Sequence, residues 1–230
     1  MNEELELFRF KYDKNPKSKD SLIFMNPGFE TVGDSIKEII ELTKEVLKVK
    51  INIRAFVLPD NTLVGKFNAL ASRNNDILFI GITKSLIEIL NEKELRFVIG
   101  HEIGHGIFNH IQIKDEFEGI FSQCKEISAD RVGFASVGDI AIAASTIHKM
   151  KYGLKYKNIE INIRNLMHLK KNPLEGVPTT HPIDSLRLES IIKFSMSKIY
   201  KEYIGEISYV FDNDKLDNLI YSKIKNQSLV

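Results

Sequence analysis

The sequence predicts an α+β domain that is mainly helical and has a small β-sheet in its N-terminal half. Two segments, 51–58 and 76–83, are rich in apolar branched residues and have turn residues between them, which is typical of strands. Around and after them, apolar residues recur at the three- and four-residue spacing of helices. A length of 230 residues suggests roughly one domain, and a hydrophobic share of 43% is that of an ordinary globular protein.

The N-terminal half is expected to contain three helices besides the strands. Residues 1–20 carry many charges and a turn-prone stretch, so we expect an irregular or loosely attached lead-in. Apolar residues at helical spacing after Gly33 predict a helix with one buried face. A second helix is expected at 83–90. Asn91 can cap the third, with Glu94 at the N3 position of a capping box.

The second half of the chain is expected to be mainly helical. Helices are predicted at 121–135 and 140–151, with a glycine-containing break between them. Three prolines and a glycine at 171–182 predict a long loop, after which a helical pattern resumes at 183–203. The last residues have the pattern of an amphipathic helix packed on the domain. The predicted division is a lead-in (1–20), a main domain (21–203) and a C-terminal extension (204–230).

Composition excludes several functional classes. Lys and Arg (32) nearly balance Asp and Glu (31), so no positive field is expected to recruit nucleic acid or an anionic membrane. The first residues lack the apolar core of a secretory signal, and no segment reaches the roughly 20 apolar residues of a membrane-spanning helix. Cys124 is the single cysteine, which excludes an intramolecular disulfide and agrees with a reducing compartment. The cytoplasm is therefore the expected location.

The sequence His101-Glu102-Ile103-Gly104-His105, an HExxH motif, lies inside the helix that starts after Asn91. At about 100 degrees per residue, the two histidines lie about 40 degrees apart and one turn along, so both imidazoles can reach one ion. Catalytic zinc sites take three protein ligands and keep a position for water, whose pKa the metal lowers. Glu102 is one position from a ligand and can act as the base for that water.

The motif is specific but short, so a third ligand matters. With six His in 230 residues, HExxH is expected by chance about 0.01 times per chain. Glu126 on the next predicted helix is the candidate third ligand, and Asp130 four positions later faces the same way, where it can accept a hydrogen bond from a ligand histidine. Without the HExxH helix, an exposed acidic face would be the plainer interpretation of this pair.

His110 and Cys124 are weaker ligand candidates. On a continuous helix His110 would lie about 180 degrees from His101, and Cys124 about 160 degrees from Glu126. We therefore interpret His110 as a helix-end contact and Cys124 as a small buried residue. With three protein ligands the site stays open, which is the catalytic form of zinc binding.

These residues resemble the gluzincin metallopeptidase family that includes HtpX and the CAAX prenyl protease, in its soluble catalytic-domain form. The resemblance spans roughly residues 50–190, and its specificity lies in the order of four segments rather than in HExxH alone. The matching segments are 68–71, 94–110, the stretch from Glu126 to Arg131, and the stretch from Thr180 through His181-Pro182 to Arg187.

The resemblance implies a zincin-like fold with one Zn²⁺ per chain on His101, His105 and Glu126. It also implies that Asp130 and Arg187 support the ligands, that His181 contacts substrate or the oxyanion, and that Asn68 lies on an edge strand where a peptide substrate pairs. From the residues alone, His181 can equally be a loop residue before a helix with proline in its first turn. The chain lacks the membrane helices of HtpX and the prenyl protease, so prenylated substrates are not expected.

The predicted function is that of a zinc-dependent endopeptidase acting on peptides or unfolded proteins, with Glu102 as general base for metal-activated water. One alternative is a module of the same fold that keeps the metal but acts by binding a partner, as a chaperone does. The other is a latent protease whose 171–182 loop covers the cleft. Glu102 argues against the first, because a purely structural metal site needs no base beside its ligands.

Overall fold

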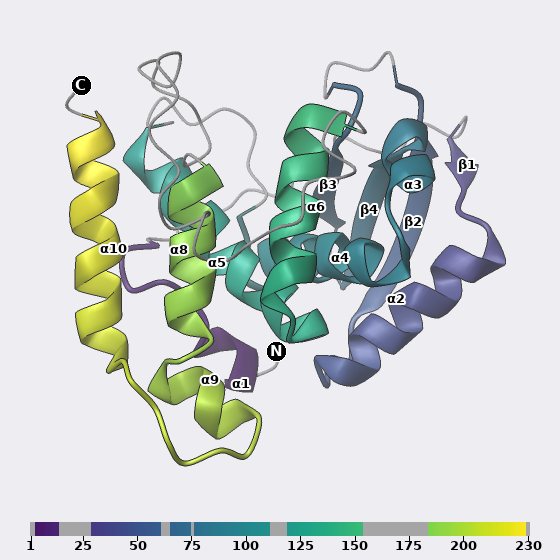
Figure 1. The fold of residues 1–230 in the computed structure, drawn as a ribbon. Coiled ribbons are helices and arrows are strands. Elements are labelled where there is room, and N and C mark those ends of the chain that lie inside the picture. Colours follow the sequence, from purple (N-terminus) through teal and green to yellow (C-terminus); the bar gives the residue numbers. More distant parts are fainter. Residues whose placement is uncertain are drawn as a thin grey trace.

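A computed structural model describes residues 3–13, 29–60, 65–74, 76–110, 119–153 and 184–228. Within these ranges a four-stranded sheet lies beside a larger set of helices, with the helix α4 (Glu92–Ile107) between the two (Figure 1). The predicted α+β class, mainly helical with a small sheet, is thereby confirmed. The predicted loop at 171–182 and His181, the residue expected to contact substrate, lie outside the described residues.

The sheet has the order β1-β2-β4-β3. Strands β2 (Asn52–Leu58) and β4 (Ile77–Thr83), which the sequence predicted, pair in parallel. β1 (Glu30–Thr31) and β3 (Ala69–Asn74) pair antiparallel on either side and form the two edges among the described strands. All but the first residue of β4 are buried, which explains its continuous apolar run, because a central strand covered on both faces needs no polar alternation.

The helices of the first half follow the predicted pattern. α2 (Asp34–Val46) begins after Gly33, and α3 (Lys84–Ile89) follows β4 directly. The capping box of α4 is present: the Asn91 side chain accepts from the Glu94 N–H at 3.0 Å, and the Glu94 carboxylate accepts from the Asn91 N–H at 2.8 Å. A polar cap thus fixes the start of α4.

The helices α5 (Ile120–Val137) and α6 (Ile140–Tyr152) agree with the prediction, and Gly138 between them takes a left-handed φ of 64°. The predicted helix at 183–203 is interrupted. It forms α8 (Asp184–Phe194) and α9 (Lys198–Tyr203), because Ser197 caps α9 and pairs with Phe211 in an isolated bridge. The helical pattern does not reveal this break, since the bridge partner comes from a later segment.

The two chain ends pack onto the helical part. α10 (Asn213–Ser228), yellow in Figure 1, contacts α5 and α8 and buries Leu216, Ile220 and Ile224. At the other end, α1 (Glu3–Glu6) is followed by residues 7–13, in which Phe8 and Phe10 are fully buried. These ends therefore belong to the same hydrophobic core.

This packing differs from the expected loose lead-in over residues 1–20. Phe8 packs edge-on against Phe194 of α8, and the Arg131 guanidinium of α5 lies over the Phe10 ring. The apolar cover for both rings comes from helices far along the chain, so the local sequence, with its many charges, gave no sign of it. Residues 14–28 lie outside the described ranges, and the domain boundaries at 20 and 203 stay predictions.

Candidate metal centre

Close contact between α4 and α5 creates the setting of the candidate site. A Cβ atom on Gly104 would lie 3.0 Å from the Ala129 Cα, and one on Gly133 would lie 2.9 Å from the Phe97 carbonyl oxygen. Because neither position carries a side chain, the two backbones approach directly. The inward faces of α4 and α5 therefore meet, and polar side chains of one helix reach those of the other.

The three predicted ligands, His101, His105 and Glu126, lie close together at this contact. The Nε2 atoms of His101 and His105 are 3.0 Å apart. The Glu126 carboxylate lies 3.5 Å from each of them, through Oε2 to His101 and through Oε1 to His105. One ligand atom from each of the three residues lies within 4.8 Å of the other two. The helical spacing on α4 and the crossing of α5 thus bring together three groups that can bind one ion.

The separations fit a metal of the zinc type. Two ligand atoms bound tetrahedrally at about 2.0–2.1 Å lie roughly 3.4 Å apart. The two Nε2 atoms are 3.0 Å apart, and each lies 3.5 Å from a different oxygen of Glu126. Two imidazole nitrogens with one carboxylate oxygen form a ligand set that zinc accepts. These residues therefore fit a zinc ion.

The other ring nitrogen of His101 faces a buried ion pair. Its Nδ1 lies 3.0 Å from Asp130 Oδ1. The Arg187 guanidinium donates to the same carboxylate, from Nε at 2.8 Å and from Nη2 at 2.6 Å. Asp130 is fully buried, and Arg187 charge and hydrogen bonds hold the pKa of its carboxyl below the usual range although burial alone would raise it. With a metal at Nε2, an ionised Asp130 would hold the one remaining His101 proton on Nδ1.

The electrostatics of the group favour a cation. Burial by itself would lower the pKa of the His101 imidazole, but the hydrogen bonds and charges of Asp130 and Glu126 raise it to about 10. Two carboxylates on one buried imidazole thus create a site with excess negative charge, which a proton occupies when no metal does. A divalent cation satisfies the same demand.

His110 is a contact at the end of α4, but it lies against His105 instead of pointing away from the ligands. α4 ends at Ile107, and Asn109 takes a left-handed φ of 56°. The His110 N–H then donates back to the His105 carbonyl at 2.9 Å, as in a Schellman turn. This reversal brings His110 Nδ1 to 2.9 Å from His105 Nδ1. The continuous-helix assumption was wrong, and Asn109, a residue that tolerates this conformation, was the overlooked signal.

Asp13 is a member of the cluster that the sequence did not indicate. Its Oδ2 lies 2.7 Å from His110 Nε2 and accepts from the Ser128 hydroxyl at 2.7 Å. Burial alone would raise the pKa of Asp13, but the His110 and Ser128 hydrogen bonds and the nearby Arg9 hold it below its usual value. Burial lowers the pKa of His110 despite Asp13. The Asp13 carboxylate accepts a hydrogen bond from His110 Nε2.

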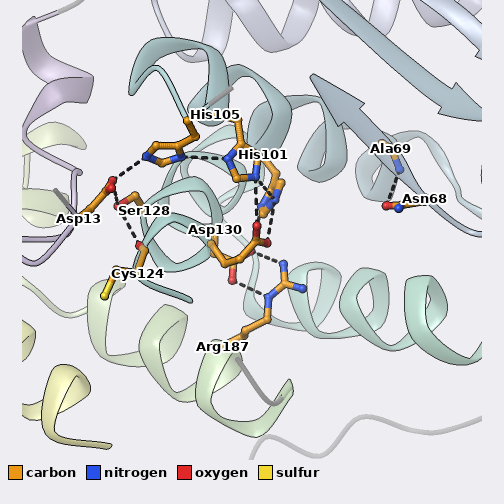
Figure 2. Close-up of polar contacts among 11 residues, drawn as sticks. Asp13, Asn68, Ala69, His101, His105, Cys124, Ser128, Asp130 and Arg187 are labelled. Carbon is orange, nitrogen blue, oxygen red and sulfur yellow. Dashed lines mark hydrogen bonds and ion pairs between the residues drawn. The ribbon is translucent and has the colours of Figure 1, made fainter. Parts of the chain in front are cut away.

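The remaining predicted residues are less closely grouped. Glu102 is buried on α4 between the two histidines in sequence. Asn68 immediately precedes the edge strand β3, and its side chain accepts from the Ala69 N–H at 2.9 Å. Figure 2 shows Asn68 apart from the histidines, with Asp13, His101, His105, Asp130 and Arg187 gathered together. Cys124 is fully buried on α5, and burial raises the pKa of its thiol to about 12, as expected of a residue in the core.

A buried histidine, a partly buried histidine and a buried carboxylate, with buried polar partners, define a candidate metal centre of the metallopeptidase kind. The family model of peptidase family M48 matches residues 56–125, which include the HExxH sequence and end one residue before Glu126. The match confirms, over these residues, the resemblance to the gluzincin family of HtpX and the CAAX prenyl protease, and it suggests a metalloprotease.

No curated protein and no solved structure matches the chain. In the part of the chain that the structure describes, no helix has the length and apolar character needed to cross a membrane.

Proposed function

We propose that the protein is a zinc-dependent endopeptidase in which His101, His105 and Glu126 hold one Zn²⁺ per chain. The observation that carries the proposal is the convergence of these three groups within 4.8 Å of one another at the contact of α4 and α5. It has support from the M48 match, because that family consists of metallopeptidases. Zinc bound there would supply a Lewis acid and lower the pKa of water.

We assign separate roles in peptide hydrolysis to several residues of the chain. Glu102, one position from a ligand, accepts the proton of the attacking water on its carboxylate and delivers it to the leaving amine. Asp130, itself held by Arg187, orients His101 through the 3.0 Å contact at Nδ1. By the family resemblance, His181 would contact the oxyanion or the substrate.

The proposed substrate is an extended peptide or an unfolded protein. β3 is an edge strand, so its outer backbone groups can pair with a peptide main chain, a mode that tolerates many side-chain sequences. Asn68 at the start of β3 would contact that peptide. The nearly balanced charge of the chain argues against a nucleic-acid partner, and the free thiol of Cys124 fits a reducing location such as the cytoplasm.

The test is hydrolysis of casein by the metal-loaded protein, run beside Glu102→Gln with the zinc content of both measured. We expect the variant to retain zinc and to lose on the order of 100-fold or more in rate, because the base is removed while the ligands stay. Glu92→Gln is the matched control, since Glu92 is an exposed residue of the same helix. Absence of zinc from wild type would overturn the metal site. Zinc in both proteins with cleavage by neither would favour a partner-binding module or a latent protease.

A further inference from the structure

We propose that Asp13 and His110 are positioning residues of the metal centre. Together they hold the His105 imidazole in the tautomer whose Nε2 directs its lone pair at the metal. The inference rests on the proposed function, because the tautomer of His105 matters only if His105 is a ligand. It assigns a role in the site to the N-terminal segment, 97 positions away from His110.

The proton positions follow from the hydrogen bonds. Asp13 Oδ2, as a carboxylate oxygen, can only accept, so His110 Nε2 at 2.7 Å carries a hydrogen. When His105 Nε2 binds a metal, the one ring hydrogen of His105 is on Nδ1. In the 2.9 Å contact between the two rings, His105 Nδ1 is then the donor and His110 Nδ1 the acceptor. The hydrogen bonds run from His105 through His110 to Asp13, and His105 Nε2 keeps its lone pair on the side of Glu126.

Burial and anchoring make Asp13 a fixed end for the hydrogen bonds that run from His105 through His110. The side chains of Asp13 and His110 are each 1% exposed, so bulk water does not compete for their hydrogen bond. The Ser128 hydroxyl both donates to Asp13 Oδ2 and accepts from the Phe10 N–H at 3.0 Å. It therefore fixes the carboxylate and the backbone of the same segment.

Two further contacts hold the segment in place. The Lys11 N–H donates to Asp217 Oδ2 of α10 at 2.7 Å, and Arg131 of α5 donates to the Phe8 carbonyl at 3.3 Å. Arg131 also pairs with Asp217. Asp217 thus anchors the N-terminal segment through Lys11 and Arg131, so Asp217→Asn is a control for general loosening of this segment.

The two ligand histidines are supported differently. His101 contacts its carboxylate, Asp130, directly across the α4 and α5 contact. His105 is linked to the Asp13 carboxylate through the imidazole of His110. In both, a buried anion decides which ring nitrogen keeps the proton, and such partners usually contribute 10–100-fold to metal affinity.

The first experiment reads the tautomers of zinc-loaded wild type by ¹⁵N NMR of the histidine rings, with His110→Gln used to assign the His110 signals. We expect a protonated Nε2 and an unprotonated Nδ1 in His110, and a protonated Nδ1 in His105. A proton on His110 Nδ1 would overturn the proposal, because that nitrogen could then not accept a hydrogen bond from His105 Nδ1.

The second experiment measures zinc Kd by chelator competition, and the thermal midpoint of each metal-free protein, for four variants. Asp13→Asn and His110→Gln should each raise the zinc Kd by about 10–100-fold. The double variant should be no weaker than His110→Gln alone, because Asp13 acts through His110. Asp217→Asn should lower the thermal midpoint but raise the zinc Kd less than Asp13→Asn does.

The outcomes separate this inference from the proposed function. If Asp13→Asn weakens zinc binding no more than Asp217→Asn does, or if the two single effects add in the double variant, the positioning role is wrong. If wild type binds no zinc, the proposed function fails. The tautomer measurement on the metal-free protein then still decides whether Asp13 and His110 fix the His105 proton.

Discussion

At the scale of single residues, the candidate centre depends on the ring nitrogens that face away from it. The Nε2 atoms of His101 and His105 lie 3.0 Å apart. The Nδ1 atom of His101 contacts Asp130, and that of His105 contacts His110. Since a neutral imidazole has one hydrogen, the partner at Nδ1 decides whether Nε2 can bind a metal. The outer partners are therefore as decisive as the ligands themselves.

The Asp130 and Arg187 pair allows a stability prediction. Asp130→Asn should destabilise the protein by about 3–5 kcal/mol, because it removes the carboxylate charge that pairs directly with the buried Arg187 guanidinium. It should also raise the zinc Kd by about 10–100-fold through His101. The measurements are urea unfolding of the metal-free protein and chelator competition.

The double variant Asp130→Asn with Arg187→Met is the control for the uncompensated charge. It should be more stable than Asp130→Asn alone, since a flexible apolar side chain replaces the unpaired cation. Zinc binding should stay weak, because the His101 partner is still changed. Equal stability of the two proteins would show that the ion pair is not the source of the loss.

At the scale of elements, the α4 and α5 contact determines where the ligands meet. Gly104 and Gly133 let the two backbones approach, while the capping box at Asn91 and the turn at Asn109 define where α4 begins and ends. A shift of either helix would separate Glu126 from the histidines. The geometry of the site is thus a property of the packed pair.

Gly133→Ala tests this packing. Helix propensity alone would favour alanine by about 1 kcal/mol. The new Cβ, however, would lie 2.9 Å from the Phe97 carbonyl oxygen and 3.3 Å from the His101 Cβ, and a backbone oxygen cannot move without moving α4. We expect a net loss of about 1–2 kcal/mol in urea unfolding together with weaker zinc binding.

Gly119→Ala is the control for this substitution, because its Cβ would meet nothing within 4 Å at the start of α5. Its stability and zinc Kd should stay near those of wild type. A Gly133→Ala protein as stable as wild type, or one with an unchanged zinc Kd, would mean that the helices tolerate separation.

At the scale of the whole molecule, both chain ends enclose the helical side of the centre. The N-terminal segment lies against α5 and α10, where Tyr12 stacks on Tyr221 with ring centroids 3.8 Å apart and Lys11 binds Asp217. The ends of the chain and the HExxH helix therefore share one folding unit. Metal binding at the centre should therefore change the thermal stability of the entire described fold.

Zinc is accordingly expected to raise the thermal midpoint of the metal-free protein. At a free zinc concentration about 100 times Kd, the stabilisation is about 2.7 kcal/mol, which for a chain of 230 residues corresponds to roughly 5–11 °C. Calorimetry with and without zinc measures the shift, and chelator should reverse it. Magnesium at the same concentration is the control, since it avoids nitrogen ligands. No shift with zinc would contradict a metal site in this fold.

The sequence by itself determined what depends on local periodicity. The strands β2 and β4, the capping box at Asn91, and the placing of His101 and His105 one turn apart follow from regular spacings that every helix or strand obeys. Glu126 was also proposed from the sequence, as a carboxylate on the helix predicted to follow the HExxH helix.

Only the tertiary structure decided which distant residues surround the ligands. The pairing of Asp13 with His110, the burial of Phe8 and Phe10, and the break before α9 all need partners from remote parts of the chain. Such contacts depend on how the whole chain packs, and a charged, turn-rich segment has the same local signature whether or not a core covers it. Periodicity thus determined the ligand spacing, and packing determined the environment of those ligands.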